Sequence, residues 1–289
     1  MMHGRSWFRT LALVLGFAFL YVPIVSLIVF SFNKSRLVTV WGGFSTKWYG
    51  ELLGNQQILD AAWLSLKVAA LSATLAVVLG TLAGLVLARF GPFRGRTLLS
   101  GMTTAPLVMP EVITGLSLLL LFVTLEQLIG WPRGRGMTTI VIAHVTFAMA
   151  FVTVIVQSRM AQLDDSLEEA AQDLGARPAK VFFLITLPIV FPALLSGWLL
   201  AFTLSLDDLV IASFVAGPGS STLPMVVFSK VRLGVSPDIN ALATILVSVV
   251  AVGVVIAGFT MARQQKVRDR DAQMALAANQ EMVESLKKG

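Results

Sequence analysis

The sequence predicts an all-α, polytopic membrane protein with six transmembrane helices and a two-helix cytoplasmic loop between the fourth and fifth. The composition is the first reason: 56% of the 289 residues are hydrophobic and 13% are charged, with a mean hydropathy of +0.82, whereas soluble domains carry about 25% charged residues. The second reason is a series of apolar runs long enough to cross a bilayer. The third is one polar insert, residues 157–187, which we call the two-helix loop.

The apolar runs define the expected spans. The first run, residues 11–32, follows Arg5 and Arg9 and is too long for a signal-peptide core, so we expect an uncleaved span. Aromatic residues in the polar segment that follows, Trp41, Trp48 and Tyr49, are expected to anchor an external loop at the membrane interface. The remaining spans are expected at residues 59–88, 98–125, 138–156, 188–206 and 239–262.

The distribution of Lys and Arg indicates the orientation. If the N-terminus is cytoplasmic, the inside segments hold about twice as many Lys and Arg as the outside loops, as the positive-inside rule expects. This places both termini and the two-helix loop in the cytoplasm, and it explains the net charge of +6 without nucleic acid as a partner. We therefore expect a single domain over residues 1–289, with a membrane bundle at 10–262, the loop at 157–187 and a polar cytoplasmic tail at 263–289.

The two-helix loop encodes two short helices at an angle. Ser166 followed by Glu169 has the spacing of a capping box at the start of the first helix. Gly175 is placed to end that helix, and Pro178 suits the first position of the second. We expect Pro188 to end the second helix.

The same loop, together with the residue that follows it, carries seven positions at fixed offsets: Glu169, Ala170, Ala171, Gly175, Ile185, Leu187 and Pro188. This spacing resembles the cytoplasmic signature of permease subunits in binding-protein-dependent ABC importers. In that family the helix pair docks into a cleft on an ATP-hydrolysing subunit and passes its motion to the membrane helices. The resemblance implies the same ATPase-coupling role here, and the alternative is an ordinary turn between two spans.

Three carboxylates lie within or at the end of apolar runs, where an ionisable group needs a partner, water or a ligand. Glu111 follows Pro110 in the third run and is expected near the midplane, beside a helix that the proline loosens. Asp207 and Asp208 end the fifth run and point about 100° apart on a helix. All three are candidates for a substrate path. The alternative for Glu111 is that it pairs with a neighbouring helix or subunit, and the alternative for the two aspartates is that they only mark the end of a span. We expect His144 to form hydrogen bonds between packed helices rather than to relay protons.

Longer segments resemble the permeases of polyamine importers, and the likeness covers residues 10–262. The resemblance rests on residues 105–116, 202–214, 217–219, 222–224 and 234–244, and residues 37–41 with 48–53 are similar to the putrescine branch. It implies an inner-membrane importer in a bacterium. Its expected parts are this subunit, a second homologous permease, two copies of an ABC ATPase and a periplasmic polyamine-binding protein.

These observations favour a transport subunit that performs no covalent chemistry. The sequence has no Gly-x-x-x-x-Gly-Lys-Ser/Thr loop, so ATP and Mg would be bound by the partner ATPase. With no cysteine and two histidines, we expect no cofactor, catalytic residue or metal site in this chain. The expected cargo is putrescine, with spermidine or another small cation as the alternative. The alternative functions from other classes are an ion-coupled secondary transporter and an intramembrane enzyme. An enzyme with two catalytic aspartates would need them on facing helices, whereas Asp207 and Asp208 are adjacent and have a poor geometry for sharing a proton.

Overall fold

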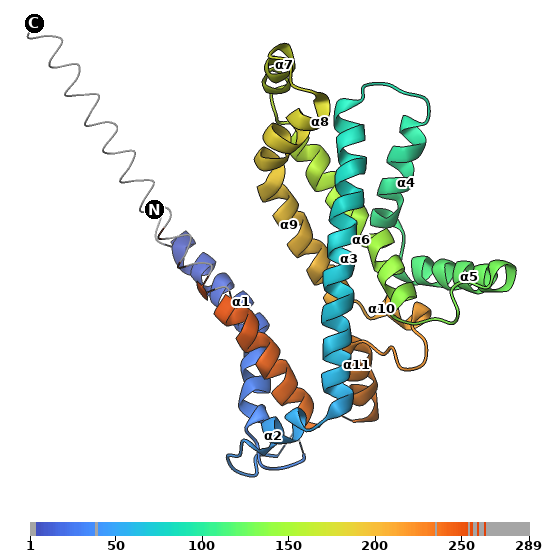
Figure 1. The fold of residues 1–289 in the computed structure, drawn as a ribbon. Coiled ribbons are helices and arrows are strands. Elements are labelled where there is room, and N and C mark those ends of the chain that lie inside the picture. The colour runs from blue at the N-terminus through green and yellow to red at the C-terminus, as the bar shows by residue number, and fades with distance from the viewer. Residues whose placement is uncertain are drawn as a thin grey trace, which may run out of the picture. The chain divides into compact units, whose positions relative to one another are not determined.

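The computed structural model describes residues 4–37, 40–234, 236–253, 255–256, 259 and 263. Within these ranges the chain is helical, and its only paired extended residues form an isolated bridge between Asn33 and Phe44 (Figure 1). The predicted all-α class is confirmed. The predicted polar tail at 263–289 lies outside the described residues, apart from its first residue.

The labelled helices follow one another along the chain as α1 (Gly4–Ser31), α2 (Lys47–Leu53), α3 (Gln56–Arg89), α4 (Arg96–Val108), α5 (Glu111–Ile129), α6 (Met137–Met160), α7 (Ser166–Asp173), α8 (Pro178–Val181), the π-helical segment η1 (Phe182–Thr186), α9 (Leu187–Leu206), α10 (Val210–Val215) and α11 (Leu223–Leu233). Five helical segments among the described residues are long and apolar enough to cross a membrane: Trp7–Ser31, Gln56–Arg89, Glu111–Ile129, Met137–Met160 and Pro178–Leu206. A shorter apolar helix, Pro237–Gly253, lies in the predicted sixth span.

The chain divides into two compact units, and the first contains the described parts of residues 1–54 and 234–289. In this unit Asn33 organises the turn after α1, because its side-chain amide donates to the Val40 carbonyl at 2.7 Å and its Oδ1 accepts the Gly42 N–H at 2.8 Å. Trp48 Nε1 donates to the Asn33 carbonyl at 2.6 Å, and the Trp48 side chain is buried. The prediction that Trp48 is an interfacial anchor is therefore wrong.

The second unit, residues 55–233, is built on the contact of α3 with α6 and α9 (Figure 1). Two glycines of α3 allow the close approach. A Cβ at Gly80 would lie 2.8 Å from Val152 Cβ, and a Cβ at Gly84 would lie 3.0 Å from Val156 Cβ. Small residues at such positions let the backbones of membrane helices pack closely.

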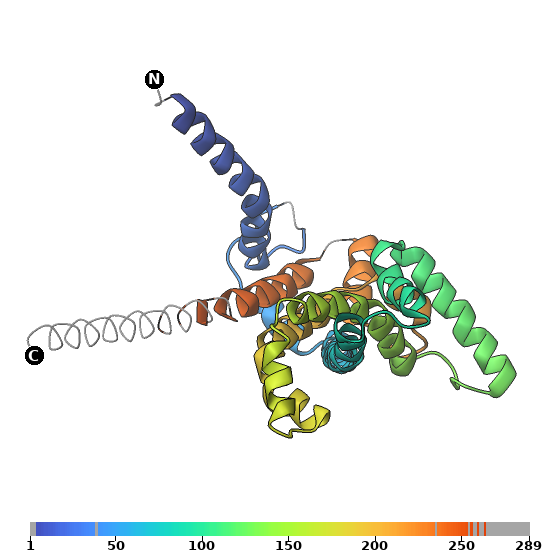
Figure 2. The same ribbon diagram turned by 90° about the horizontal axis from the view of Figure 1, so that it is seen from above.

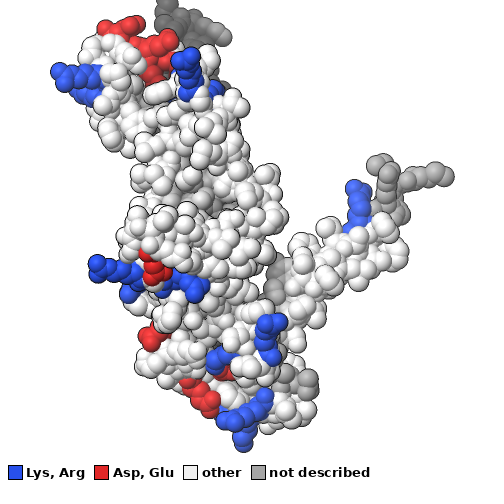
Figure 3. Space-filling view, turned by 90° about the vertical axis from the view of Figure 1, so that its right-hand side faces the viewer, with Lys and Arg blue, Asp and Glu red and all other residues white. Residues whose placement is uncertain are grey.

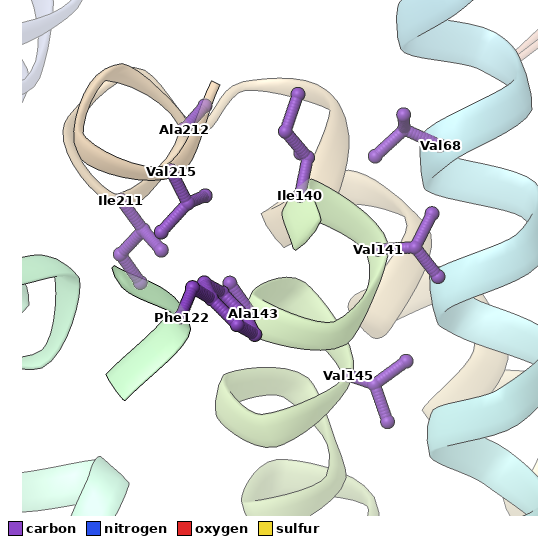
Figure 4. Packing of buried hydrophobic residues seen from close by; sticks show 9 residues of the cluster. All are labelled: Val68, Phe122, Ile140, Val141, Ala143, Val145, Ile211, Ala212 and Val215. Atoms are coloured by element: carbon purple, nitrogen blue, oxygen red, sulfur yellow. The ribbon is translucent and has the colours of Figure 1, made fainter. Parts of the chain in front are cut away.

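One of the two hydrophobic clusters of this unit joins α3, α5, α6 and α10. Figure 4 shows Val141 and Val145 of α6 directed toward α3, with Phe122 of α5 beside Ala143. Nine buried residues make up the cluster: Val68, Phe122, Ile140, Val141, Ala143, Val145, Ile211, Ala212 and Val215. Because α10 contributes three of them, the short segment after α9 is part of the core rather than a loop.

The third span predicted at residues 98–125 is wrong as a continuous helix. α4 ends at Val108, Met109 has an extended ψ of 136°, and α5 begins at Glu111. The cause is Pro110, which lacks a backbone N–H and disfavours helical geometry in the residue before it. α5 runs away from α4 (Figure 1, Figure 2) and packs against α10, where a Cβ at Gly115 would lie 2.7 Å from the Phe214 ring.

Candidate functional site

The first helix of the two-helix loop starts differently from the prediction. Ser166 is already its first helical residue, Asp165 is the N-cap, and the N-cap makes no side-chain capping bond, so the expected capping box is absent. Instead the Asp164 carboxylate accepts the Ser166 backbone N–H at 3.0 Å. This bond, assisted by the Ser166 hydroxyl, holds the pKa of Asp164 below its ordinary value.

Gly175 ends α7 as predicted, and the geometry explains why glycine is needed. Its φ is +84°, in the left-handed region. The Gly175 N–H bonds to the Gln172 carbonyl at 2.8 Å and the Ala176 N–H to the Ala171 carbonyl at 3.0 Å, which is the pair of bonds of a Schellman motif. A side chain here would have open space around it, so the requirement is conformational rather than steric.

The second helix of the loop begins at Pro178 as predicted, but Pro188 does not end it. α8 continues through the π-helical segment η1 directly into α9, in which Pro188 is the second residue. The Leu187 N–H bonds to the Phe182 carbonyl, five residues back. A π turn just before the proline accommodates its missing N–H, so the loop and the fifth span form one continuous helical segment.

The outer face of the two-helix loop is exposed and carries apolar side chains. Among the seven signature positions, Glu169, Ala170, Gly175 and Pro188 are exposed, whereas Ala171, Ile185 and Leu187 are half-buried. Leu174 is 90% exposed, and Leu167, Phe183 and Leu184 are at least half exposed. On the face in Figure 3, charged side chains gather at the end that carries α7 and α8, above a broad uncharged surface. Exposed apolar side chains on a polar helix such as α7 are typical of a surface that binds another protein.

Sequence reasoning missed the contacts on the inner face of the loop. Arg89, the last residue of α3, forms ion pairs with Asp165 and Glu168, and Thr186 donates a hydrogen bond to Glu168. In the sequence, Arg89 contributes only to the Lys and Arg distribution that indicates the orientation. No local pattern predicts pairs separated by about 80 residues, so only the structure identifies them.

The structure separates the roles of the two adjacent aspartates. One Asp208 carboxylate oxygen lies 3.1 Å from His144 Nε2 and accepts the Ala212 N–H at 2.7 Å, and the other accepts the Ile211 N–H at 3.2 Å. His144 Nδ1 lies 2.6 Å from the Ser205 hydroxyl, and the His144 side chain is 2% exposed. Asp208 therefore joins α6, α9 and α10, and His144 has the packing role expected for it.

The other two candidate carboxylates have no such internal role. Asp207 follows the last residue of α9 and is exposed, and Glu111 is exposed in the first turn of α5, where the helix dipole favours a negative charge. Glu111 was expected inside a continuous span and lies instead directly after the break. Gly115 and Ile211, each four residues after one of these acids, are in contact, so the elements that carry the two acids meet. Within the described chain no hydrogen bond joins the acids themselves.

Replacing Asp208 should destabilise the fold, because Asp208→Ala removes the acceptor for His144 and for two backbone N–H groups at the start of α10. We expect a loss of about 1–3 kcal/mol, the typical cost of an unsatisfied buried donor. Asp207→Ala is the matched control and should change the stability by less than about 0.5 kcal/mol. Thermal unfolding of the purified subunit measures both, and equal melting temperatures for the two variants would contradict this assignment.

Comparison with known proteins identifies the family of this arrangement. Residues 76–268 match the family described as binding-protein-dependent transport system inner membrane component. The putrescine transport system permease protein PotI of Escherichia coli (strain K12) is 61% identical over 94% of this chain and 96% of that protein. The spermidine/putrescine transport system permease protein PotC of the same strain is 43% identical over 86% and 91%.

Solved structures show the same fold at low sequence identity. A bacterial ABC transporter involved in the import of the acidic polysaccharide alginate matches with a TM-score of 0.67 and 17% identity, over 89% of this chain and 96% of that one. The MetNI methionine ABC transporter matches with a TM-score of 0.57 and 16% identity, over 71% and 94%. With the family match over residues 76–268, these likenesses lead to one conclusion: the chain belongs to the inner membrane components of binding-protein-dependent transport systems.

Proposed function

We propose that this chain is the permease subunit of an ATP-driven importer that moves putrescine across the bacterial inner membrane. The observation that carries the proposal is the 61% identity with a putrescine permease along almost the whole length of both proteins. The relative whose name includes spermidine is less similar, at 43%, and makes spermidine the alternative cargo. Both termini of the subunit lie in the cytoplasm, which the distribution of Lys and Arg supports.

In this proposal the two-helix loop is the docking site for a separate ABC ATPase. This docking role is supported by the exposure of the signature residues Glu169 and Ala170 and of Leu174. Two ATPase copies bind ATP and Mg, a second homologous permease completes the membrane pathway, and a periplasmic binding protein delivers the polyamine. When the ATPase pair closes, the loop moves and the helices change from inward-open to outward-open; hydrolysis resets them.

The carboxylates proposed to meet the cargo are Glu111 and Asp207. Putrescine is a short apolar chain with an ammonium group at each end, so its path needs separated carboxylates with apolar surface between them. Both side chains are exposed, and neither forms an ion pair within the described chain. We leave Asp208, the third candidate, out of the proposed contact because its carboxylate already accepts two backbone N–H groups and lies 3.1 Å from His144 Nε2.

Uptake of labelled putrescine into vesicles tests the function directly. The vesicles carry this subunit with the second permease, the ATPase and the binding protein, and excess spermidine is the competitor. We expect uptake that requires ATP and persists in the presence of spermidine. Uptake without the ATPase would overturn the mechanism, and ATP-dependent activity without polyamine uptake would overturn only the cargo.

The docking role predicts that changes to the loop uncouple the importer without preventing insertion. Glu169→Lys reverses a charge on the exposed face, and Gly175→Leu places a side chain at a φ of +84°, which costs roughly 1–2 kcal/mol. Both should abolish uptake and release the ATPase when the complex is purified. Gly95→Leu, also at a positive φ but in the loop between α3 and α4, is the matched control. Retention of the ATPase by both loop variants would refute the docking role.

The path assignment predicts that neutralising either acid weakens uptake while the complex still assembles. Glu111→Gln and Asp207→Asn should each lower the uptake of putrescine about tenfold, the equivalent of one charge-assisted hydrogen bond. Asp207→Glu keeps the carboxylate and should retain most of the uptake. Unchanged uptake in both neutral variants would remove these residues from the path.

A further inference from the structure

The inner face of the two-helix loop is tied to two other elements through one carboxylate. Arg89 Nη2, at the end of α3, lies 3.4 Å from Glu168 Oε1 on α7. The same Oε1 accepts the Thr186 hydroxyl at 2.8 Å, and Thr186 is the buried last residue of η1. Arg89 also pairs with Asp165, the N-cap of α7. We call Arg89, Glu168 and Thr186 the loop clamp.

The clamp matters because apolar packing does not hold α7 in place. No residue of α7 is buried, and Leu167 in its first turn is half exposed. The clamp side chains are more enclosed: Arg89 is 14% exposed, Glu168 is 23% exposed, and Thr186 is buried. An isolated exposed ion pair contributes little to stability, but here two acids converge on Arg89 at the end of α3, and one of them also accepts the Thr186 hydroxyl. The orientation of α7 relative to α3 therefore depends on these polar contacts.

The clamp residue Glu168 and the exposed signature residues Glu169 and Ala170 lie on different sides of α7, whereas the signature residue Ala171, about 300° from Glu168, is half-buried. Adjacent helical residues are separated by about 100°, so Glu169 and Ala170 point about 100° and 200° away from Glu168. Glu169 and Ala170 are exposed, whereas Glu168 faces the ends of α3 and η1. A partner bound to the exposed side leaves the clamp intact on the other side.

We propose that the loop clamp transmits the motion of the two-helix loop to α3 and to the start of α9. The inference rests on the proposed docking of an ATPase at this loop. α3 has 34 residues and is about 50 Å long, so a displacement of its inner end reaches the opposite end of the bundle. Thr186 directly precedes α9, so the same carboxylate links the loop to two membrane helices. Arg89, Glu168 and Thr186 are positioning residues that set how much transport each ATP drives.

Three conservative variants test the clamp in the complete importer reconstituted in vesicles. Thr186→Val removes one hydroxyl at nearly constant volume, Glu168→Gln removes the charge but keeps an acceptor for Thr186, and Arg89→Gln removes the cation. Arg94→Gln is the matched control, because Arg94 is an exposed arginine on the loop between α3 and α4. Putrescine uptake and ATP hydrolysis are measured on the same vesicles, together with the ATPase that co-purifies and the melting temperature.

We expect the uptake per ATP hydrolysed to fall about three- to tenfold in the clamp variants, which lies within the roughly two- to thirtyfold range for changes along a coupling network. The amount of bound ATPase and the melting temperature should remain those of the unchanged protein, and Arg94→Gln should behave like that protein. The double variant Arg89→Gln/Glu168→Gln should lose little more than the more affected single variant, because the two side chains act through one another.

Two results would overturn the inference. One is an unchanged ratio of uptake to hydrolysis in all three clamp variants. The other is a fall in uptake that merely follows a loss of bound ATPase or of thermal stability, because the clamp would then only support the fold. Failure of the proposed function itself would be visible separately, since the unchanged protein would then bind no ATPase or show no ATP-dependent uptake.

Discussion

The close approach of α3 and α6 is the constraint on which the rest of the second unit depends. Lipid chains are as apolar as the helices, so helices associate in a bilayer through tight packing rather than through burial from water. Gly80 and Gly84 provide that packing, because any side chain there would overlap Val152 or Val156. The ends of these two helices then carry the functional parts: α7 follows the end of α6, and Arg89 at the end of α3 binds α7.

Features that depend on neighbours in the chain could be predicted from the sequence. The helical class follows from the composition, and four of the expected spans, 11–32, 59–88, 138–156 and 188–206, lie on helices within a few residues of the predicted bounds. Gly175 could be placed after the end of α7 because glycine adopts a positive φ easily, and Pro178 could be placed at the start of α8 because proline suits the first turn of a helix. The family follows from residues at fixed offsets in one loop.

Features that depend on distant residues could not be predicted. The sequence predicts Asp208 only as a candidate for the substrate path, and its contact with His144, 64 residues away, is visible only in the structure. Glu168 and Glu169 have the same local setting, and only the position of Arg89 shows that one faces inward. The capping-box pattern at Ser166 failed because Asp164, two residues earlier, already accepts the N–H at the start of α7. Pro188 stands where a proline ends many helices, but the π-helical turn before it lets the chain continue.

The break at Pro110 also determines what can surround the backbone between α4 and α5 in the membrane. α4 has 13 residues and is about 20 Å long, whereas the apolar layer of a bilayer is about 30 Å thick. If α4 starts at the cytoplasmic surface beside the arginines of its loop, the non-helical backbone at Met109 and Pro110 lies inside that layer. Irregular backbone at this depth is stable only against protein or inside a water-filled cavity, never against lipid. With α4 placed in this way, Glu111 at the start of α5 adjoins backbone that lipid cannot line.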